Sequence, residues 1–340
     1  MPLPWSGSGR ARRDCTCGTR HRGRSIRSPR DPRSEALTET AFGALVIILA
    51  GALARHFRVL SREDGPALVR IVIYLALPPL IFLIIARADL HGALLLIPVA
   101  AILVHVVLLG IGWASTRVWG MEPNRAGALI LAVAVGNTGF FGLPLIAASG
   151  AGFSLPAAVL YDVGTGLITW TSTVAVASSY GRAPGAPRPS LRQLGSALLL
   201  PPNWGLAAGV VVNLAGVDDL PRLIERPLEL LAAAVLPLTM LYTGITIELR
   251  GMPRLWGEVS YSVVMRLLVA GVIGLIVATA FQFKGDVLHT VVIMAAMPTA
   301  MMSLVIGARS GLRADVLAAA VVVTTVLATV TLPLWRAALL

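Results

Sequence analysis

Long apolar runs alternate with short polar connections from residue 36 to the end of the chain. Ten such runs follow one another, at residues 36–57, 66–87, 92–116, 124–149, 154–180, 196–216, 225–247, 256–280, 286–308 and 314–337. An apolar helix needs about 20 residues to cross the hydrocarbon core of a bilayer, and each run reaches about that length. The pattern therefore predicts an all-α polytopic membrane protein with ten transmembrane helices in a lipid bilayer.

The fourth run is interrupted at its centre by residues 135–144, VGNTGFFGLP. Three glycines, an Asn-Thr pair and Pro144 lower helix propensity there, and the proline also removes a backbone donor. Inside hydrocarbon, a broken backbone is tolerated only where it lines a protein-walled cavity. We therefore expect a discontinuous helix whose second half begins near the bilayer midplane, where free N–H groups favour an anion. A kink that serves close helix packing is the alternative.

The second half of the chain carries matching marks. A Leu-Pro pair stands at 77–78 in the second run and at 236–237 in the seventh, an offset of 159 residues. The break at Asn137 is matched by Met-Pro-Thr at 297–299 in the ninth run, an offset of about 161 residues. These matches predict an internal repeat, in which helices 4 and 9 are both broken and cross at a midplane site.

The repeat divides the chain into two five-helix units, residues 35–180 and 195–340. Because five spans is an odd number, the second unit enters the membrane from the opposite side, which makes the repeat an inverted one. Residues 181–194, with three prolines and three arginines, form the connecting loop. Residues 1–34 form a basic, polar tail that cannot build a core, and we expect it to be disordered. An over-long start assignment is a second explanation for this tail.

Composition agrees with a membrane protein. Hydrophobic residues make up 56% of the chain and charged residues only 13%, against about 25% in soluble domains. The net charge of +11 does not indicate a nucleic-acid partner, because the basic residues lie in the tail and in the short connections. Cys15 and Cys17 stand in the tail without a partner pair or a histidine cluster, so neither a disulfide framework, a metal site nor a cofactor is predicted.

Basic residues in the connections predict the orientation of the chain. One face collects thirteen arginines: Arg55, Arg58, Arg62, Arg70, Arg117, Arg125, Arg182, Arg188, Arg192, Arg250, Arg254, Arg309 and Arg313. The other face collects five basic residues: Arg87, Arg222, Arg226, Lys284 and Arg336. The first face is expected to be cytoplasmic, which places the central loop inside and both termini outside. The arginines of the tail then lie on the outer face, in conflict with the same rule.

Polar residues at the two interruptions are the candidate substrate ligands. The first interruption offers Asn137, Thr138 and Gly139, and the second offers Pro298, Thr299 and Ser303. Amide and hydroxyl groups can donate hydrogen bonds to a carboxylate, and glycines let backbone N–H groups come close. Capping of the backbone groups that each break frees is an equally good account of the hydroxyls.

Three ionisable residues stand deep in apolar runs. Asp162 has no basic neighbour within a turn, so a carboxylate that takes up and releases a proton during coupled transport is one reading, and a paired or hydrated carboxylate is the other. Arg266 is expected to face the interior, either paired with Asp162 or attracting the substrate anion. His105 is lone on an apolar helix, where a bond to a neighbouring carbonyl or hydroxyl is the ordinary reading.

Five segments together resemble the auxin efflux carrier family of membrane permeases. They are GNTGFFGLPL, PPNWGLAAGVVV, LTMLYTGITI, MPTAMMSLVIGA and the TLPLW ending. The resemblance implies ten helices in two inverted repeats, crossed broken helices 4 and 9, and transport of organic anions such as auxin, malate or malonate. It also implies that Asn137 contacts the substrate carboxylate. The short central loop resembles prokaryotic members, which implies the inner cell membrane and makes auxin itself a doubtful substrate.

A secondary carrier of small organic anions, working by alternating access, is the leading functional hypothesis. A channel or membrane receptor for a small anion is the alternative, and an intramembrane enzyme is disfavoured because no nucleophile and base or H-E-x-x-H motif stands out. No P-loop is present, so energy from ATP through that motif is not predicted. The coupling ion, a proton or sodium, and a homodimeric state are left open.

Overall fold

The computed structural model describes residues 32–90, 92–150, 152–181, 201–217, 219–247 and 252–339. The basic tail up to residue 31 and nearly all of the central loop at 181–194 lie outside these ranges, so the expectations for them stay untested. The described chain is helical, and its one pairing of extended backbone is an isolated antiparallel bridge between Gly136 and Thr299. The expectation of an all-α protein is confirmed for these residues.

The helices follow the apolar runs. The first half forms α1 (Pro32–His56), α2 (Gly65–Ile71), α3 (Leu77–Ala86), α4 (Ile97–Val118), α5 (Pro123–Ala134), α6 (Leu143–Ser149) and α7 (Leu155–Tyr180). The second half forms α9 (Pro201–Leu214), α10 (Arg222–Ala233), α11 (Val235–Thr246), α12 (Trp256–Val263), α13 (Ala270–Ala280), α14 (Gly285–Ala295), α15 (Met301–Arg309) and α16 (Ala314–Leu339). Short 3₁₀ turns lie at η1 (Arg62–Asp64), η3 (Gly92–Leu96) and η5 (Met252–Leu255).

Six helical stretches of the described chain are long and apolar enough to cross a membrane. They are Ala36–His56, Arg62–Ala86, Leu94–Val118, Arg222–Thr246, Trp256–Ala280 and Ala314–Leu339. The apolar runs at 124–149 and 286–308 are not continuous helices, because each is divided into two shorter ones. The protein is thus a multi-pass membrane protein in which two of the apolar runs form broken helices.

Wide helical turns relieve the strain of prolines inside these helices. The π-helical turns η2 (Val72–Ala76) and η4 (Thr138–Gly142) directly precede the Leu-Pro pairs that open α3 and α6. A proline cannot donate to the carbonyl four residues back and its ring presses on that carbonyl, and a wider turn accommodates both effects. A third π-helical turn, η6 (Val264–Val269), carries Arg266.

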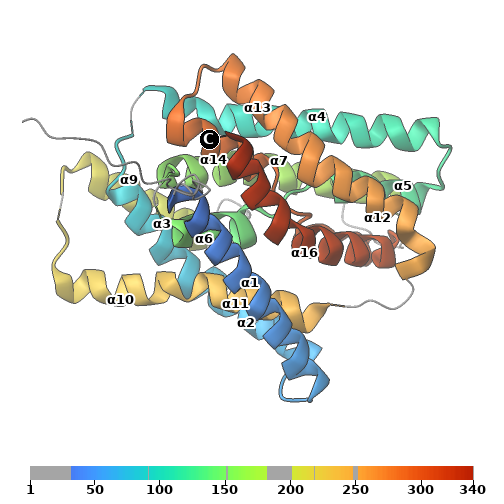
Figure 1. The fold of residues 1–340 in the computed structure, drawn as a ribbon, viewed down its shortest axis with the longest axis horizontal. Helices are drawn as coiled ribbons and strands as arrows, with labels where there is room; N and C mark the ends of the chain where they lie inside the picture. The colour runs from blue at the N-terminus through green and yellow to red at the C-terminus, as the bar shows by residue number, and fades with distance from the viewer. Residues whose placement is uncertain are drawn as a thin grey trace, which may run out of the picture. The chain divides into compact units, whose positions relative to one another are not determined.

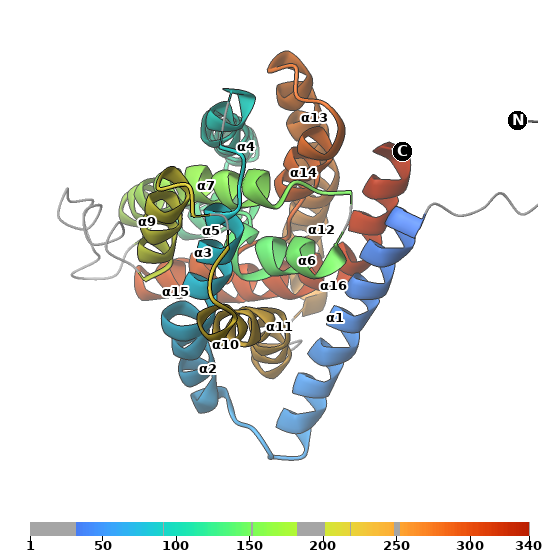
Figure 2. The same cartoon turned by 90° about the vertical axis from the view of Figure 1, so that its left-hand side faces the viewer.

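The helices form two groups that pack more closely within themselves than with each other. In the small bundle, residues 32–86 and 201–246, α1 packs along α11, and α3 packs along α9 and α10. In the large bundle, residues 97–180 and 256–339, α4 packs on α5 and α7, α13 on α14, and α16 on α5, α12 and α15. Figure 1 and Figure 2 both show α4 and α13 at one end of the view and α2, α10 and α11 at the other.

Glycines mark the places where helices come closest inside each bundle. A Cβ added to Gly51 in α1 would lie 3.1 Å from the Cα of Gly244 in α11, so these two helices cross at a glycine pair. In the large bundle, a Cβ on Gly164 of α7 would overlap the backbone of Pro98 in α4. Each described glycine with so tight a contact meets a residue of its own bundle, so the helices within each bundle are closely packed at these glycines.

Polar side chains strengthen the same internal contacts. The Asn213 side chain of α9 donates to the carbonyl of Ala88, 2.5 Å away, at the end of α3. Arg55 of α1 donates to the carbonyl of Ile247, 2.6 Å away, where α11 has ended and its last carbonyls lack helical partners. These bonds lie within the small bundle and cap the ends of its helices.

Helix α1 makes the most extensive contact between the two bundles. Helix α1 packs on α6 and α16 across the boundary. The hydroxyl of Thr40 lies 3.5 Å from the carbonyl oxygen of Ala148, and that of Thr246 lies 4.0 Å from the sulfur of Met301. Such distances are at the limit of hydrogen bonding, so these two contacts add little to the attraction between the bundles.

The glycine crossing of α1 and α11 is open to a direct stability test. In a Gly244→Ala protein the new methyl overlaps the carbonyl of Ile48, and overpacking of this kind costs about 1–3 kcal/mol. Gly110→Ala in α4 is the control, because nothing lies within 4 Å of its added Cβ. We expect melting in detergent at a lower temperature for Gly244→Ala and no loss for Gly110→Ala. Equal melting temperatures would contradict a tight crossing.

Candidate functional site

The two broken helices meet backbone to backbone. The N–H of Asn137 donates to the carbonyl of Pro298 at 2.7 Å, and the N–H of Ala300 donates to the carbonyl of Val135 at 2.9 Å. These two bonds flank the bridge between Gly136 and Thr299. Each break therefore supplies the hydrogen-bond partners that the other break has lost.

Four helix ends converge at this crossing. Helices α5 and α14 arrive with their C-terminal ends, at Ala134 and Ala295. The helix that starts at Thr138 and runs on through α6, and α15 starting at Met301, leave with their N-terminal ends. The first N–H groups of a helix have no partner within it and carry partial positive charge, so the departing ends favour an anion.

A cavity of about 330 Å³ adjoins the crossing and lies between the two bundles. The small bundle lines it with Ile73, Leu77, Ile81, Pro202, Asn203 and Leu206. The polar part of the large bundle's lining consists of Asn137, Thr138, Asp162, Thr165, Thr169 and Trp170. This volume is at the lower end of the range for small-molecule sites, so a compact ligand fits it best.

The first break presents its polar groups to this cavity. Asn137 is only 6% exposed, and its side-chain amide caps no helix N–H, which leaves the amide available to a ligand. The hydroxyl of Thr138 donates to the carboxylate of Asp162 in α7 at 2.5 Å. Asp162 is the one ionisable side chain among the described residues that line the cavity.

Gly139 is fitted to the Asp162 carboxylate. A Cβ at this position would lie 3.1 Å from one carboxylate oxygen and 3.2 Å from the other, closer than a side chain usually packs. The absence of a side chain thus lets the carboxylate rest against the first turn of the half-helix. Asn137, Thr138, Gly139 and Asp162 are the predicted site residues that the structure brings together at the cavity.

The predicted residues of the second break lie away from the cavity lining. Pro298 contributes its carbonyl to the crossing, and Ser303 donates to the carbonyl of Ala300 at 2.6 Å. Thr299 is fully buried, its hydroxyl donates to the carbonyl of Ala132 in α5 at 2.8 Å, and its N–H donates to the Thr324 hydroxyl at 3.0 Å. These bonds favour the alternative reading of the hydroxyls, in which they satisfy the backbone of the breaks.

Arg266 lies behind the crossing. Its guanidinium donates to the backbone carbonyls of Met297, Ala295 and Val133, and the described residues place no carboxylate within ion-pair distance of it. The expected ion pair with Asp162 is therefore not formed among these residues. Arg266 is also absent from the described lining of the cavity, and the second expectation, that it attracts the substrate anion, stays a prediction.

Several lining residues were not predicted. Thr165 and Thr169 follow Asp162 on α7 at helical spacing, so the same face of this helix carries all three polar groups, and that periodicity could have revealed them. Asn203 belongs to the Pro-Pro-Asn motif that opens α9, which sequence reasoning used only for the family resemblance. His105 bonds the Ser172 hydroxyl at 2.8 Å, which agrees with its ordinary reading.

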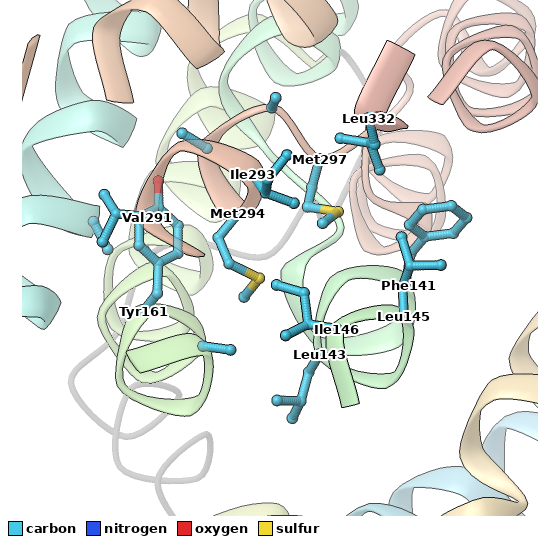
Figure 3. Packing of buried hydrophobic residues seen from close by; sticks show 14 of the residues in the cluster. Phe141, Leu143, Leu145, Ile146, Tyr161, Val291, Ile293, Met294, Met297 and Leu332 are labelled. Carbon is cyan, nitrogen blue, oxygen red and sulfur yellow. The ribbon is translucent and has the colours of Figure 1, made fainter. Parts of the chain in front are cut away.

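Apolar packing fixes the half-helix that begins at Thr138. Phe141 is fully buried, and Met294 and Met297 lie between the α14 segment and the α6 residues Leu143 and Ile146 (Figure 3). Both methionines pack against Gly142, where an added Cβ would lie 3.0 Å from each. The flexible thioether side chains fill the space that the irregular backbone leaves.

Comparison with known proteins identifies the family. A family model described as "Membrane transport protein" matches residues 36–184 and 187–336. The chain belongs to this family of membrane transport proteins. The match covers nearly all of the chain beyond the basic tail and confirms the resemblance to the auxin efflux carrier type that the sequence motifs indicated.

Similar proteins carry transporter names. An "Uncharacterized transporter" of Methanothermobacter thermautotrophicus is 32% identical over 304 residues, 89% of this chain and 98% of that protein. Another, from Methanocaldococcus jannaschii, is 24% identical over 299 residues, 86% of this chain and 95% of that protein. A "Putative malonate transporter" of Rhizobium meliloti is 26% identical over 270 residues, 76% of this chain and 82% of that protein. The chain is a membrane transporter and not an enzyme.

The water-filled character of the cavity can be tested with cysteine variants of a protein whose Cys15 and Cys17 are replaced by serine. Thr169→Cys places a thiol on the cavity wall, whereas Thr299→Cys places it at a fully buried position of the crossing. We expect a charged methanethiosulfonate reagent to modify the first in detergent within minutes and to leave the second unmodified. Comparable modification rates would show that the crossing is not sealed from the cavity.

Proposed function

We propose that this membrane transporter is a secondary carrier of small organic anions, mono- or dicarboxylates of the size of malate or auxin. The substrate carboxylate binds where the cavity meets the first break, between the Asn137 amide and the N-terminal turn that follows it. The observation that carries this proposal is the position of the crossed breaks, with two helix N-termini leaving the crossing beside a cavity between two bundles. The small cavity volume supports a compact substrate.

The full architecture that we propose has ten membrane-spanning helices in two inverted five-helix repeats. Each half of the chain supports this, because its first two apolar runs belong to the small bundle and its last three to the large one. The matching breaks in the fourth and ninth runs bridge each other at Gly136 and Thr299. On this basis the domains are residues 35–180 and 195–340, joined by a cytoplasmic loop at 181–194 and preceded by the tail at 1–34.

Anion recognition in this cavity has to rely on dipoles. None of the described residues that line the cavity carries a positive charge, so the donors among them are the Asn137 amide, hydroxyls and backbone N–H groups. The ionised carboxylate of Asp162 would repel the substrate at this range. We therefore propose that Asp162 is protonated when the anion is bound, which makes it the proton-coupling residue. The name of the Rhizobium relative supports malonate as a first probe.

The division of the helices into two bundles on either side of the cavity supports transport by alternating access. The large bundle holds the crossing and most polar lining residues, and the small bundle supplies a largely apolar wall. Close glycine packing inside each bundle and long hydrogen bonds between them support a rigid movement of one past the other. The expected location is the inner membrane of a prokaryotic cell, with both termini outside, and a homodimer remains open to measurement.

Counterflow in liposomes tests the carrier against its alternatives. Vesicles that hold the purified protein and unlabelled malonate should accumulate labelled malonate transiently and with saturation. A channel gives flux without counterflow, and a receptor gives no flux. If malonate neither flows nor shifts the melting temperature, the same pair of assays is run with other mono- and dicarboxylates. Failure of all of them would contradict an organic-anion carrier.

The ligand role of Asn137 predicts a loss of affinity without a loss of fold. Replacing it with alanine removes one or two hydrogen bonds to a charged ligand, each worth about 1.5–3 kcal/mol, so affinity should fall about tenfold to several hundredfold. Asn137→Asp should bind more weakly still, because it adds like charge. Melting without substrate is the control: a fall that matches the loss of binding would make Asn137 a structural cap instead.

The coupling role of Asp162 predicts a separation of two transport modes. Asp162→Asn keeps the shape and can still accept the Thr138 bond, but it cannot carry a proton. Accumulation driven by a pH gradient should be abolished, while exchange of substrate for substrate continues. Asp286→Asn, at the exposed start of α14, is the matched control and should transport as the unmodified protein does. Gradient-driven accumulation by Asp162→Asn would assign this carboxylate a structural role.

A further inference from the structure

A buried guanidinium stands beside the crossing without an acidic partner. Arg266 is 3% exposed, and a charge in such a place normally needs an opposite charge close by. No carboxylate among the described residues lies within ion-pair distance of it, and its hydrogen bonds all go to backbone carbonyl oxygens. Within the part of the chain that the structure describes, the compensating negative charge therefore comes from backbone carbonyls.

The carbonyls that Arg266 contacts are the ends of two helices. Nε and Nη2 donate to Met297 at 3.0 and 2.6 Å, and Nη2 also donates to Ala295 at 3.1 Å, at the end of α14. Nη1 lies 3.4 Å from the carbonyl of Val133, in the last turn of α5. A helix C-terminus carries about half a negative charge, so the two ends together balance roughly one positive charge.

The first break is shaped around this guanidinium. A Cβ added to Gly136 would overlap Nη2 of Arg266, so only glycine allows the chain to pass this close. Gly136 is also the residue that bridges Thr299. On the other side, the Trp335 indole of α16 donates to Leu267 at 2.7 Å and anchors the π-helical turn that carries Arg266. The guanidinium is thus held in a fixed position between both breaks.

In carriers with broken helices, freed carbonyls and half-helix C-terminal ends are the ligands of a coupling cation such as sodium. Here a side chain already occupies that set of carbonyls. We propose that Arg266 acts as a tethered cation at the crossing, which neutralises both helix ends permanently and removes the need for a bound alkali ion there. This inference rests on the proposed carrier function and decides between the two coupling ions in favour of the proton.

The tethered charge also assists the substrate site without touching it. Gly136 lines the large cavity on one side and meets the guanidinium on the other, so one residue separates the positive charge from the anion site. Its field favours the bound anion in a cavity where no described lining residue is a cation. Arg266 is in this sense a positioning residue for both the crossing and the substrate.

The melting temperature of the substrate-free protein tests this proposal. The protein is compared in sodium chloride and in N-methyl-D-glucamine chloride at equal ionic strength. The unmodified protein should melt at the same temperature in both. Arg266→Gln should melt several degrees lower in N-methyl-D-glucamine and regain part of the loss with millimolar sodium or guanidinium. Arg266→Lys, which keeps the charge, should fall between the two and respond less to added cations.

Thr299→Val is the matched control, because it weakens the crossing by removing the hydroxyl bond to Ala132 while leaving the charge in place. Its loss of stability should not be restored by any of these cations. Sodium-specific stabilisation of the unmodified protein would overturn the proposal, as would an Arg266→Gln defect that no cation relieves. If Arg266→Gln does not fold, the melting temperatures of Arg266→Lys and of the unmodified protein in the two salts still test the proposal.

Malonate uptake by the unmodified protein in sodium and in N-methyl-D-glucamine completes the test. Equal uptake supports the proposal, and uptake that requires sodium overturns it. Absence of uptake in both salts would count against the carrier function and its probe. The melting comparison of the substrate-free variants does not depend on that result, so the two failures can be told apart.

Discussion

A backbone that is broken inside hydrocarbon has to find new hydrogen-bond partners, and the crossing of the two breaks meets this demand. The bonds from Asn137 to Pro298 and from Ala300 to Val135 pair one break with the other, so neither could stand alone in the bilayer. Thr299 and Thr324 complete the set with hydroxyl bonds. Glycine at 136 and 139 follows from the same constraint, because the crossing brings the guanidinium of Arg266 and the carboxylate of Asp162 against the backbone.

The negative and positive ends of the helices face different partners at the crossing. The C-terminal ends of α5 and α14 point to Arg266, while the N-terminal ends of the departing helices point toward the cavity. The positive ends are thereby left for an anion. Asp162, held by Thr138, is the group at the cavity wall whose charge can be switched by a proton. Under the proposed function, binding of an anion and protonation of this carboxylate are linked, since each lowers the electrostatic cost of the other.

The sequence predicted where the two helices are broken, but not which groups form hydrogen bonds with the backbone at each break. Three glycines, Pro144 and Asn137 within ten residues predicted an interrupted helix, because these residues act locally on helix propensity. The groups that the Arg266 guanidinium contacts depend on where α14 ends relative to η6. Tertiary packing sets that arrangement, and local sequence patterns do not reveal it. For the same reason sequence reasoning could not choose between substrate binding and backbone capping for Thr299 and Ser303, whose hydroxyls bond to backbone carbonyls in the structure. The division into bundles likewise depends on tertiary packing and not on the apolar runs.

The proposed alternating access requires that the large bundle carry the crossing as a rigid unit past the small bundle. Pulsed electron paramagnetic resonance on spin-labelled pairs measures this directly, with Val59→Cys and Val118→Cys across the bundles and Val118→Cys and Arg309→Cys within the large one, all at exposed positions. Addition of a transported carboxylate should shift the distance distribution of the first pair and leave that of the second unchanged. A shift within the large bundle, or an unchanged distance across the bundles, would contradict the movement.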